Sequence, residues 1–195
     1  MRPLQRADLL SLEAYAVERP AFRARVLAHK RARRLALGAH ASLLFEDRLT
    51  AHYQVQEMLR IERIFEPDRV QDELDAYNPL IPDGSDLRAT LMLEYADRAQ
   101  RRDALPRLAG IERAVFAEVA GAGRCRAQRI DDTDAASASA DKAAALCLLR
   151  FAFPEPAIAA LRGGAALAFG IDDPRMPLRV ETTADQRASL LRDLQ

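Results

Sequence analysis

The hydrophobic pattern of this chain changes near residue 85, and the change limits the folds that the sequence can adopt. Before it, apolar residues recur with the spacing of helices that bury one face. After it, residues 88–95 alternate, with Leu91, Leu93 and Tyr95 on one face, as in a half-buried strand. The sequence therefore predicts an α+β protein in which N-terminal helices cover a mostly antiparallel sheet of about five to six strands.

No linker is long enough to separate two domains, so we expect a single domain, 1–195, with a helical half, 1–82, and a sheet-rich half, 86–195. Gly38 is expected to follow the end of the second helix, and Thr50 to cap the third. Residues 131–141 have low complexity and are expected to form a mobile loop. The predicted helices are 9–18, 20–37, 50–65, 67–77, 98–113, 154–162 and 185–193, and the predicted strands are 41–46, 88–95, 115–120, 124–130, 145–153, 165–171 and 178–182.

The sequence shows no sign of export or of membrane insertion. Its first residues lack the apolar core of a signal peptide, and it contains no run of 18 apolar residues. The two cysteines, Cys125 and Cys147, are too few for a small disulfide scaffold. We therefore expect a reduced, cytoplasmic protein that does not act at a membrane.

The charged residues are segregated along the chain although the formal net charge is zero. Residues 19–45 contain seven basic side chains and no acid, whereas residues 66–97 contain nine acids and two arginines. The blocks either face one another, within a chain or across a dimer, or are solvated. Alternatively, the basic helix 19–34 is an RNA-binding module, but it interleaves only one aromatic residue, Phe22, so a nucleic-acid partner is not favoured.

Residues 50–65 form the most unusual predicted helix. Projected at about 100° per residue, its apolar side chains cover most of the circle, and Gln54 and Glu62 fall inside that apolar arc. A buried carboxylate needs a partner or an upward pKa shift. The segment is therefore either a salt-bridge network or a site for a small carboxylate or zwitterionic ligand, in a binding protein or an enzyme. The candidate ligand-binding residues are Glu46, Arg48, Gln54, Gln56, Glu57, Arg60, Glu62 and Arg63.

Several common catalytic motifs are missing. The sequence has no HExxH, CxxC, GxSxG or Walker A motif, and its single Gly-Ala-Gly lacks the third glycine of a dinucleotide fingerprint. We therefore predict no metal site and no cofactor, and the sequence leaves open whether the protein is an enzyme.

Several segments resemble a known bacterial family. They are RADLLSLEAY at 6–15, RPAFRAR at 19–25, LLFEDR at 43–48, YQVQEMLR at 53–60 and ELDAYNPL at 73–80. Together they resemble DUF3501, a family of uncharacterised function. The resemblance implies a cytoplasmic bacterial protein associated with redox or oxidative-stress systems. On this basis the leading hypothesis is an accessory or interaction protein that binds a redox protein and forms a homo-oligomer, most simply a homodimer.

Overall fold

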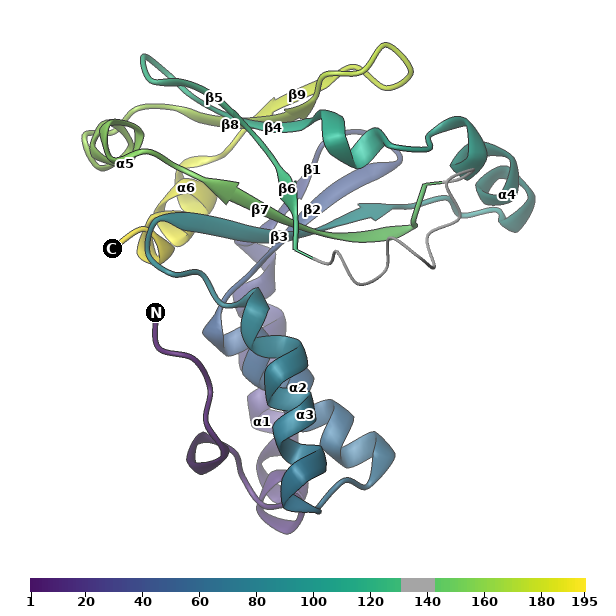
Figure 1. Cartoon of the computed structure of the whole chain (residues 1–195), viewed down its shortest axis with the longest axis vertical. Helices are drawn as coiled ribbons and strands as arrows, with labels where there is room; N and C mark the ends of the chain where they lie inside the picture. The colour runs from purple at the N-terminus through teal and green to yellow at the C-terminus, as the bar shows by residue number, and fades with distance from the viewer. Residues whose placement is uncertain (131–142) are drawn as a thin grey trace.

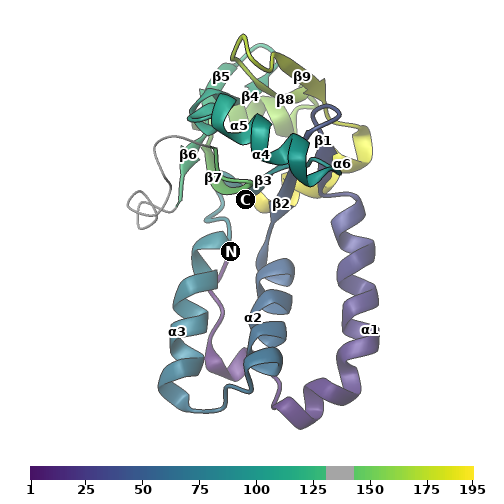
Figure 2. The ribbon, with the colours of Figure 1, turned by 90° about the vertical axis from the view of Figure 1, so that its right-hand side faces the viewer.

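A computed structural model describes residues 1–130 and 143–195 of the chain. Three helices project as a stem from a body built of two sheets (Figure 1). The stem consists of α1 (Leu12–Arg31), α2 (Arg48–Glu62) and α3 (Pro67–Tyr77), with α2 in the middle (Figure 2). The N-terminal segment runs back along one side of the stem, where Leu4, Leu9 and Leu12 pack with the apolar residues of α2 and α3.

Nine strands form the body within the described residues, and all their pairings are antiparallel. The five-stranded sheet has the order β1-β2-β3-β7-β6 and the four-stranded sheet the order β5-β4-β8-β9. The strands are β1 (Arg34–Ala36), β2 (Ala41–Glu46), β3 (Asp86–Leu93), β4 (Val115–Val119), β5 (Gly123–Arg126), β6 (Gln128–Arg129), β7 (Leu146–Ala152), β8 (Leu167–Ile171) and β9 (Leu178–Glu181).

The two sheets pack face to face around the main apolar core. Phe45 and Phe151 of the five-stranded sheet meet Phe169 of the four-stranded sheet, with ring centroids 4.7 and 5.2 Å from it. The chain crosses between the sheets at Ala127, which lies between β5 and β6 and donates its N–H to Val115. Gly170 is required on β8, because a Cβ there would lie 2.6 Å from the Phe116 ring.

Three further helices lie on the body, and they differ in burial. They are α4 (Arg98–Arg107), α5 (Glu155–Arg162) and α6 (Ala184–Leu190). Helix α5 buries Ile158 and Leu161 against the core, whereas α4 buries no residue. Short 3₁₀ turns at Arg6–Asp8, Asn78–Leu80, Ile111–Ala114 and Leu191–Asp193 complete the regular structure of the described residues.

The structure confirms the α+β class and the antiparallel sheet, and it corrects their arrangement. The inner face of the five-stranded sheet is covered by a second sheet rather than by the N-terminal helices, which project away from it (Figure 1). The described strands number nine, in sheets of five and four, instead of one sheet of about five or six, and the three helices predicted in the C-terminal half are present as α4, α5 and α6. Because β1 and β2 lie within residues 1–82, both halves of the chain contribute to one sheet.

Three local predictions about where helices begin and end are wrong. Pro20 lies inside one continuous helix, α1, because the carbonyl that it leaves unpaired belongs to the exposed Ala16 and can bond to water. That helix ends at Arg31 instead of near Gly38, because residues 34–36 alternate in burial and pair with β2. Asp47 caps α2, and Thr50 completes its capping box. The loop predicted at 131–141 lies outside the described residues.

A buried guanidinium joins the stem to the body. Arg33 follows α1, is 1% exposed and uses all five of its N–H groups. They donate to the backbone carbonyls of Phe45, Glu46 and Ser189 and to both carboxylate oxygens of Asp193. Asp193 is 1% exposed, and burial raises its pKa to about 6. The group therefore fixes the end of α1 and the end of β2 against the C-terminus.

Arg33→Met is expected to lower the free energy of unfolding by about 3–5 kcal/mol, because it leaves Asp193 buried without its partner. Urea unfolding measures this loss, and Asp193→Asn tests the same pair if Arg33→Met does not fold. Arg34→Met is the matched control, because the neighbouring Arg34 makes an exposed ion pair with Glu94, worth about 1 kcal/mol or less. Equal small losses in Arg33→Met and Arg34→Met would contradict the role assigned to Arg33.

Candidate functional site

The structure distributes the predicted site residues over several neighbourhoods. Glu57 is the centre of one of them, on the side of α2 that faces α1. Its carboxylate accepts two hydrogen bonds from Arg19, at 2.7 and 2.9 Å, one from the Tyr15 hydroxyl at 2.7 Å, and two longer ones from Arg60. The hydrogen bonds from the arginines and Tyr15 lower the pKa of Glu57 to about 2. Glu57 and Arg60 thus belong to an ion-pair network that joins α1 to α2.

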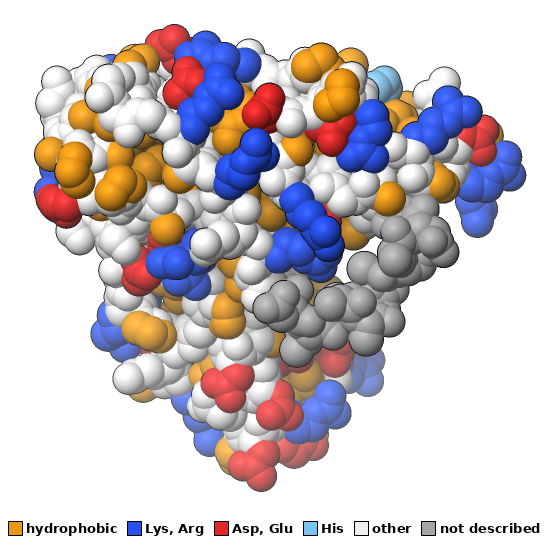
Figure 3. All heavy atoms as spheres, turned by 45° about the horizontal axis from the view of Figure 1, so that its top comes forward, with side chains coloured by type: hydrophobic (Ala, Val, Ile, Leu, Met, Phe, Trp, Pro, Cys, Tyr) orange, Lys and Arg blue, Asp and Glu red, His pale blue; other side chains and the backbone are white. Residues whose placement is uncertain are grey.

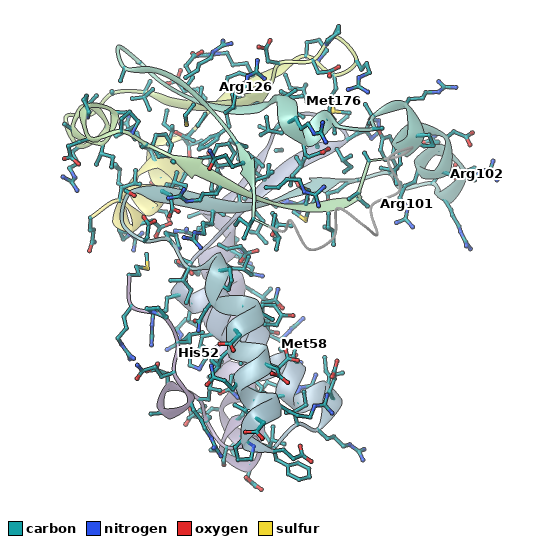
Figure 4. The ribbon with its side chains drawn as sticks, in the orientation of Figure 1. His52, Met58, Arg101, Arg102, Arg126 and Met176 are labelled. Carbon is teal, nitrogen blue, oxygen red and sulfur yellow. The ribbon has the colours of Figure 1, made fainter. Side chains whose placement is uncertain are left out.

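The expectation that Glu62 is buried is wrong. Its side chain is 44% exposed and lies 3.8 Å from Arg69 of α3. Of the two buried polar residues of α2, Thr50 belongs to the capping box, and Gln56 accepts from the Leu10 N–H at 2.6 Å and donates to the Leu10 carbonyl. The N-terminal segment covers that side of α2, so Gln56 is buried together with the apolar Ala51, Val55 and Leu59. Figure 4 shows His52 on the side facing this segment and Met58 on the other side.

The remaining candidates also lie apart from one another. Glu46 ends β2, is 3% exposed and accepts from the Thr90 hydroxyl at 3.1 Å. Arg48 donates to the Arg2 carbonyl and lies 2.9 Å from Asp8. Gln54 is half-buried, and Arg63 is exposed in the left-handed conformation, with φ 54°. A ligand-binding role for the eight residues stays a prediction, and the structure brings only Glu57 and Arg60 into direct contact.

No metal site is apparent among the residues described, because none of their histidines, cysteines and acids form a group of three placed to hold an ion. The outer face of the four-stranded sheet also pairs its charges internally. Glu118 there accepts from Arg124 and from Arg179, the latter at 2.6 Å. Acidic side chains accordingly lie beside basic ones on this face (Figure 3).

A large groove lies on the other sheet. It has a volume of about 1340 Å³ and runs over the outer face of the five-stranded sheet, between the end of α1 and α4. Leu44, Met92 and Leu146 line this groove, and Ser42, Met92 and Leu146 are aligned across three neighbouring strands. Leu146 is 63% exposed, and Leu27 of α1, at the edge of the groove, is 45% exposed. The groove thus offers apolar side chains to whatever binds it.

The rim of this groove is basic. Lys30 and Arg31 of α1 and Arg101 of α4 line it, and none of the three makes an ion pair with a described residue. Arg34, also on the rim, is paired with Glu94. The two carboxylate oxygens of Glu94 accept from the Arg34 guanidinium at 2.7 and 2.8 Å. Hydrogen bonds from Ser42 and Arg34 lower the pKa of Glu94. Within the described residues, the groove therefore carries three positive charges without an ion-pair partner above an apolar floor.

Sequence reasoning missed this groove because it assumed that helices cover the sheet. The signal was present, since β3 was expected to place Thr90, Met92 and Glu94 on one face. The facing residues of β2 and β7 on that side, Leu44 and Leu146, are apolar where a solvated face is normally polar. Apolar residues on an outward face indicate a surface that binds something.

Fold and site together define an α+β protein with an open, basic-rimmed groove. The chain belongs to the DUF3501 family, described as a protein of unknown function, whose sequence model matches residues 3–194. This confirms the resemblance. A crystal structure of a novel protein of unknown function from Burkholderia pseudomallei K96243 is 46% identical, covers 100% of both chains and superposes with a TM-score of 0.94. A comparison with curated proteins found no match. No helix in residues 1–130 or 143–195 is long and apolar enough to cross a membrane.

The Glu57 network predicts a defined pH dependence of stability. Because the folded pKa lies near 2, below the ordinary value of 4.5, the stabilisation is complete above about pH 5 and is lost as the pH falls through 2. Glu57→Gln should therefore lower Tm by about 2–4 °C at pH 6, and by much less near pH 2. Thermal unfolding followed by circular dichroism across this range measures the difference.

Glu62→Gln is the matched control for this prediction, because the Glu62 carboxylate is exposed and lies near only one guanidinium. It should change Tm little at any pH. A Tm difference between wild type and Glu57→Gln that stays constant from pH 6 to pH 2 would count against the network.

Proposed function

We propose that this protein is an accessory protein that acts by binding another protein through the groove on its five-stranded sheet. The observation that supports the proposal is that one concave surface combines exposed apolar side chains with cations that make no ion pair to a described residue. Burying Leu146 and Leu27 provides a hydrophobic gain, and cations at the rim select the partner by charge. The matching partner is a protein segment that carries both apolar and acidic side chains.

The groove favours a protein segment over RNA. Binding of a polyanion depends on phosphate contacts, and sequence readout of single strands depends on aromatic platforms. Here the floor is aliphatic. The ring pair at the groove, His40 and Tyr95, is stacked on itself with centroids 4.5 Å apart. Two arginines of the basic segment 19–34, the alternative RNA-binding module, already form ion pairs within the chain. They are Arg19 and Arg33.

The identity of the partner is a further part of the proposal. The family resemblance associates the protein with cytoplasmic redox or oxidative-stress systems, and we propose a redox protein of that compartment as the partner. Only the resemblance supports this step. Native extract passed over immobilised wild-type protein and over a groove variant, followed by mass spectrometry of the difference, tests it. Recovery of proteins with no redox role would refute the association and leave the groove proposal intact.

Reversal of the rim charges tests the groove itself. The double variant Arg31→Glu, Arg101→Glu should bind a fluorescein-labelled peptide of alternating Leu and Glu at least about tenfold more weakly than wild type, a loss of about 1.4 kcal/mol. Fluorescence anisotropy measures the affinity. Wild-type affinity should also fall as salt rises, because the contacts at the rim are solvent-exposed.

Arg126→Glu is the control, because it reverses an arginine on the outer face of the four-stranded sheet, away from the groove (Figure 4). Its peptide affinity should equal that of wild type. Equal affinity of the double variant and wild type would refute the proposal. So would tighter, salt-dependent binding of oligouridine than of the acidic peptide, which would instead assign the groove to RNA.

A further inference from the structure

A second exposed apolar surface lies at the far end of the stem, and we call it the stem tip. It is formed by Ile61, Glu62, Phe65, Glu66 and Asp68, where α2 ends and α3 begins. Ile61 is 60% exposed and Phe65 is 69% exposed. Of the six large apolar side chains exposed in the described residues, two therefore lie at the stem tip, and two others, Leu27 and Leu146, line the groove.

The exposure of Phe65 is built into the turn. Arg63 ends α2 in the left-handed conformation, which is costly for a residue with a Cβ. The N–H of the next residue, Ile64, donates to the Leu59 carbonyl, and Ile64 is 2% exposed. The chain thus buries Ile64 and directs Phe65 outward. A fixed turn that presents an aromatic residue is a suitable anchor for an interface.

The stem tip and α3 carry an excess of negative charge, opposite in sign to the basic rim of the groove. Glu66, Asp68, Asp72 and Glu73 make no ion pair with a described residue. They outnumber Arg63 and Arg69, the basic residues of this region, and Arg69 lies near Glu62. Burial and the neighbouring Glu62 raise the pKa of Glu73, as expected where acids crowd together. Acidic side chains gather near the lower end of the stem in Figure 3.

We infer that the stem tip of one copy of this chain docks into the groove of a second copy, so that two copies form an antiparallel dimer with two equivalent tip–groove contacts. Phe65 and Ile61 meet the apolar floor, and the acids beside them meet Lys30, Arg31 and Arg101. The inference rests on the proposed function, because it takes the groove to be a protein-binding surface. It also adds regulation, since a partner must displace the stem tip.

The geometry of the chain suits such a pair. The body extends beyond the stem on both sides, with α5 at one end and α4 at the other, so that there is an angle between the stem and the α4 end of the body (Figure 1). The 20-residue helix α1 is about 30 Å long, which places the stem tip well away from the groove of its own chain. A twofold axis makes the same two surfaces meet twice, as in most homodimers.

Analytical ultracentrifugation over a dilution series tests the dimer. Wild type should sediment as two chains, and Phe65→Glu as one chain, because it places a carboxylate in the apolar contact. Val17→Glu is the matched control, because Val17 is 82% exposed on α1 and lies outside both surfaces. It should remain dimeric. A monomeric wild type, or a Phe65→Glu variant that stays dimeric, would overturn the inference.

A charge swap makes the test specific to the proposed contact. One variant reverses the stem tip, Glu66→Arg with Asp68→Arg, and the other reverses the groove, Arg31→Glu with Arg101→Glu. Each alone should be monomeric, because both of its contacts oppose like charges. Their mixture should form a heterodimer, because both contacts then join opposite charges. A mixture that stays monomeric while wild type dimerises would place the dimer interface elsewhere and refute the inference.

Peptide binding separates failure of this inference from failure of the proposed function. Phe65→Glu has a free groove, so it should bind the Leu–Glu peptide more tightly than dimeric wild type does. If wild type is monomeric and both proteins bind the peptide equally, the self-docking fails and the partner-binding function stands. If the dimer forms as described and Phe65→Glu binds no peptide, the dimer stands and partner binding through the groove fails.

Discussion

The position of the stem relative to the sheets depends on the buried guanidinium of Arg33. Its five N–H groups bind the end of β2 and the last turn of the chain, which are separated by more than 140 residues. An arginine in the interior is tolerated only when every donor and its charge are satisfied. These segments are therefore fixed relative to α1, and α1 leaves the sheet in one direction. The groove between its end and the outer sheet face is a consequence of that direction.

The neutral net charge conceals two kinds of charged residue. One kind is used to hold the fold. Asp86 is fully buried beneath Arg88 and Arg150, and Glu57 joins α1 to α2. The other kind makes no ion pair with a described residue and lies on separate surfaces, basic at the groove and acidic along α3. Among the described residues, Arg34 and Glu94 form the one ion pair between the basic and acidic blocks of the sequence. Segregation along the chain is thus retained in space.

Periodicity predicted the elements well where a single face is buried. Residues 41–46 and 67–77 match β2 and α3, and the alternation around Leu91 matches the inner face of β3. It failed where the burying partner comes from a distant part of the chain. Gln56 is buried by Leu10, and Glu62 is exposed because it is the last residue of α2, at the end of the stem. The groove was missed for a related reason, since the N-terminal helices were expected to cover the sheet but project away from it (Figure 1), and Leu44 and Met92 line the groove on its outer face.

Folding alone does not account for the surfaces that remain open. In the stem, the N-terminal segment covers one side of α2. In the body, the two sheets cover each other's inner faces. Exposed residues such as Phe65 and Leu146 lower solubility and add nothing to these cores. Each lies beside unpaired charge, and the charge at the stem tip is opposite to that at the groove. Apolar exposure with matching but opposite charge is the property of an interface. Function in this chain is therefore expected at the ends of the molecule rather than along the ion pairs of the stem.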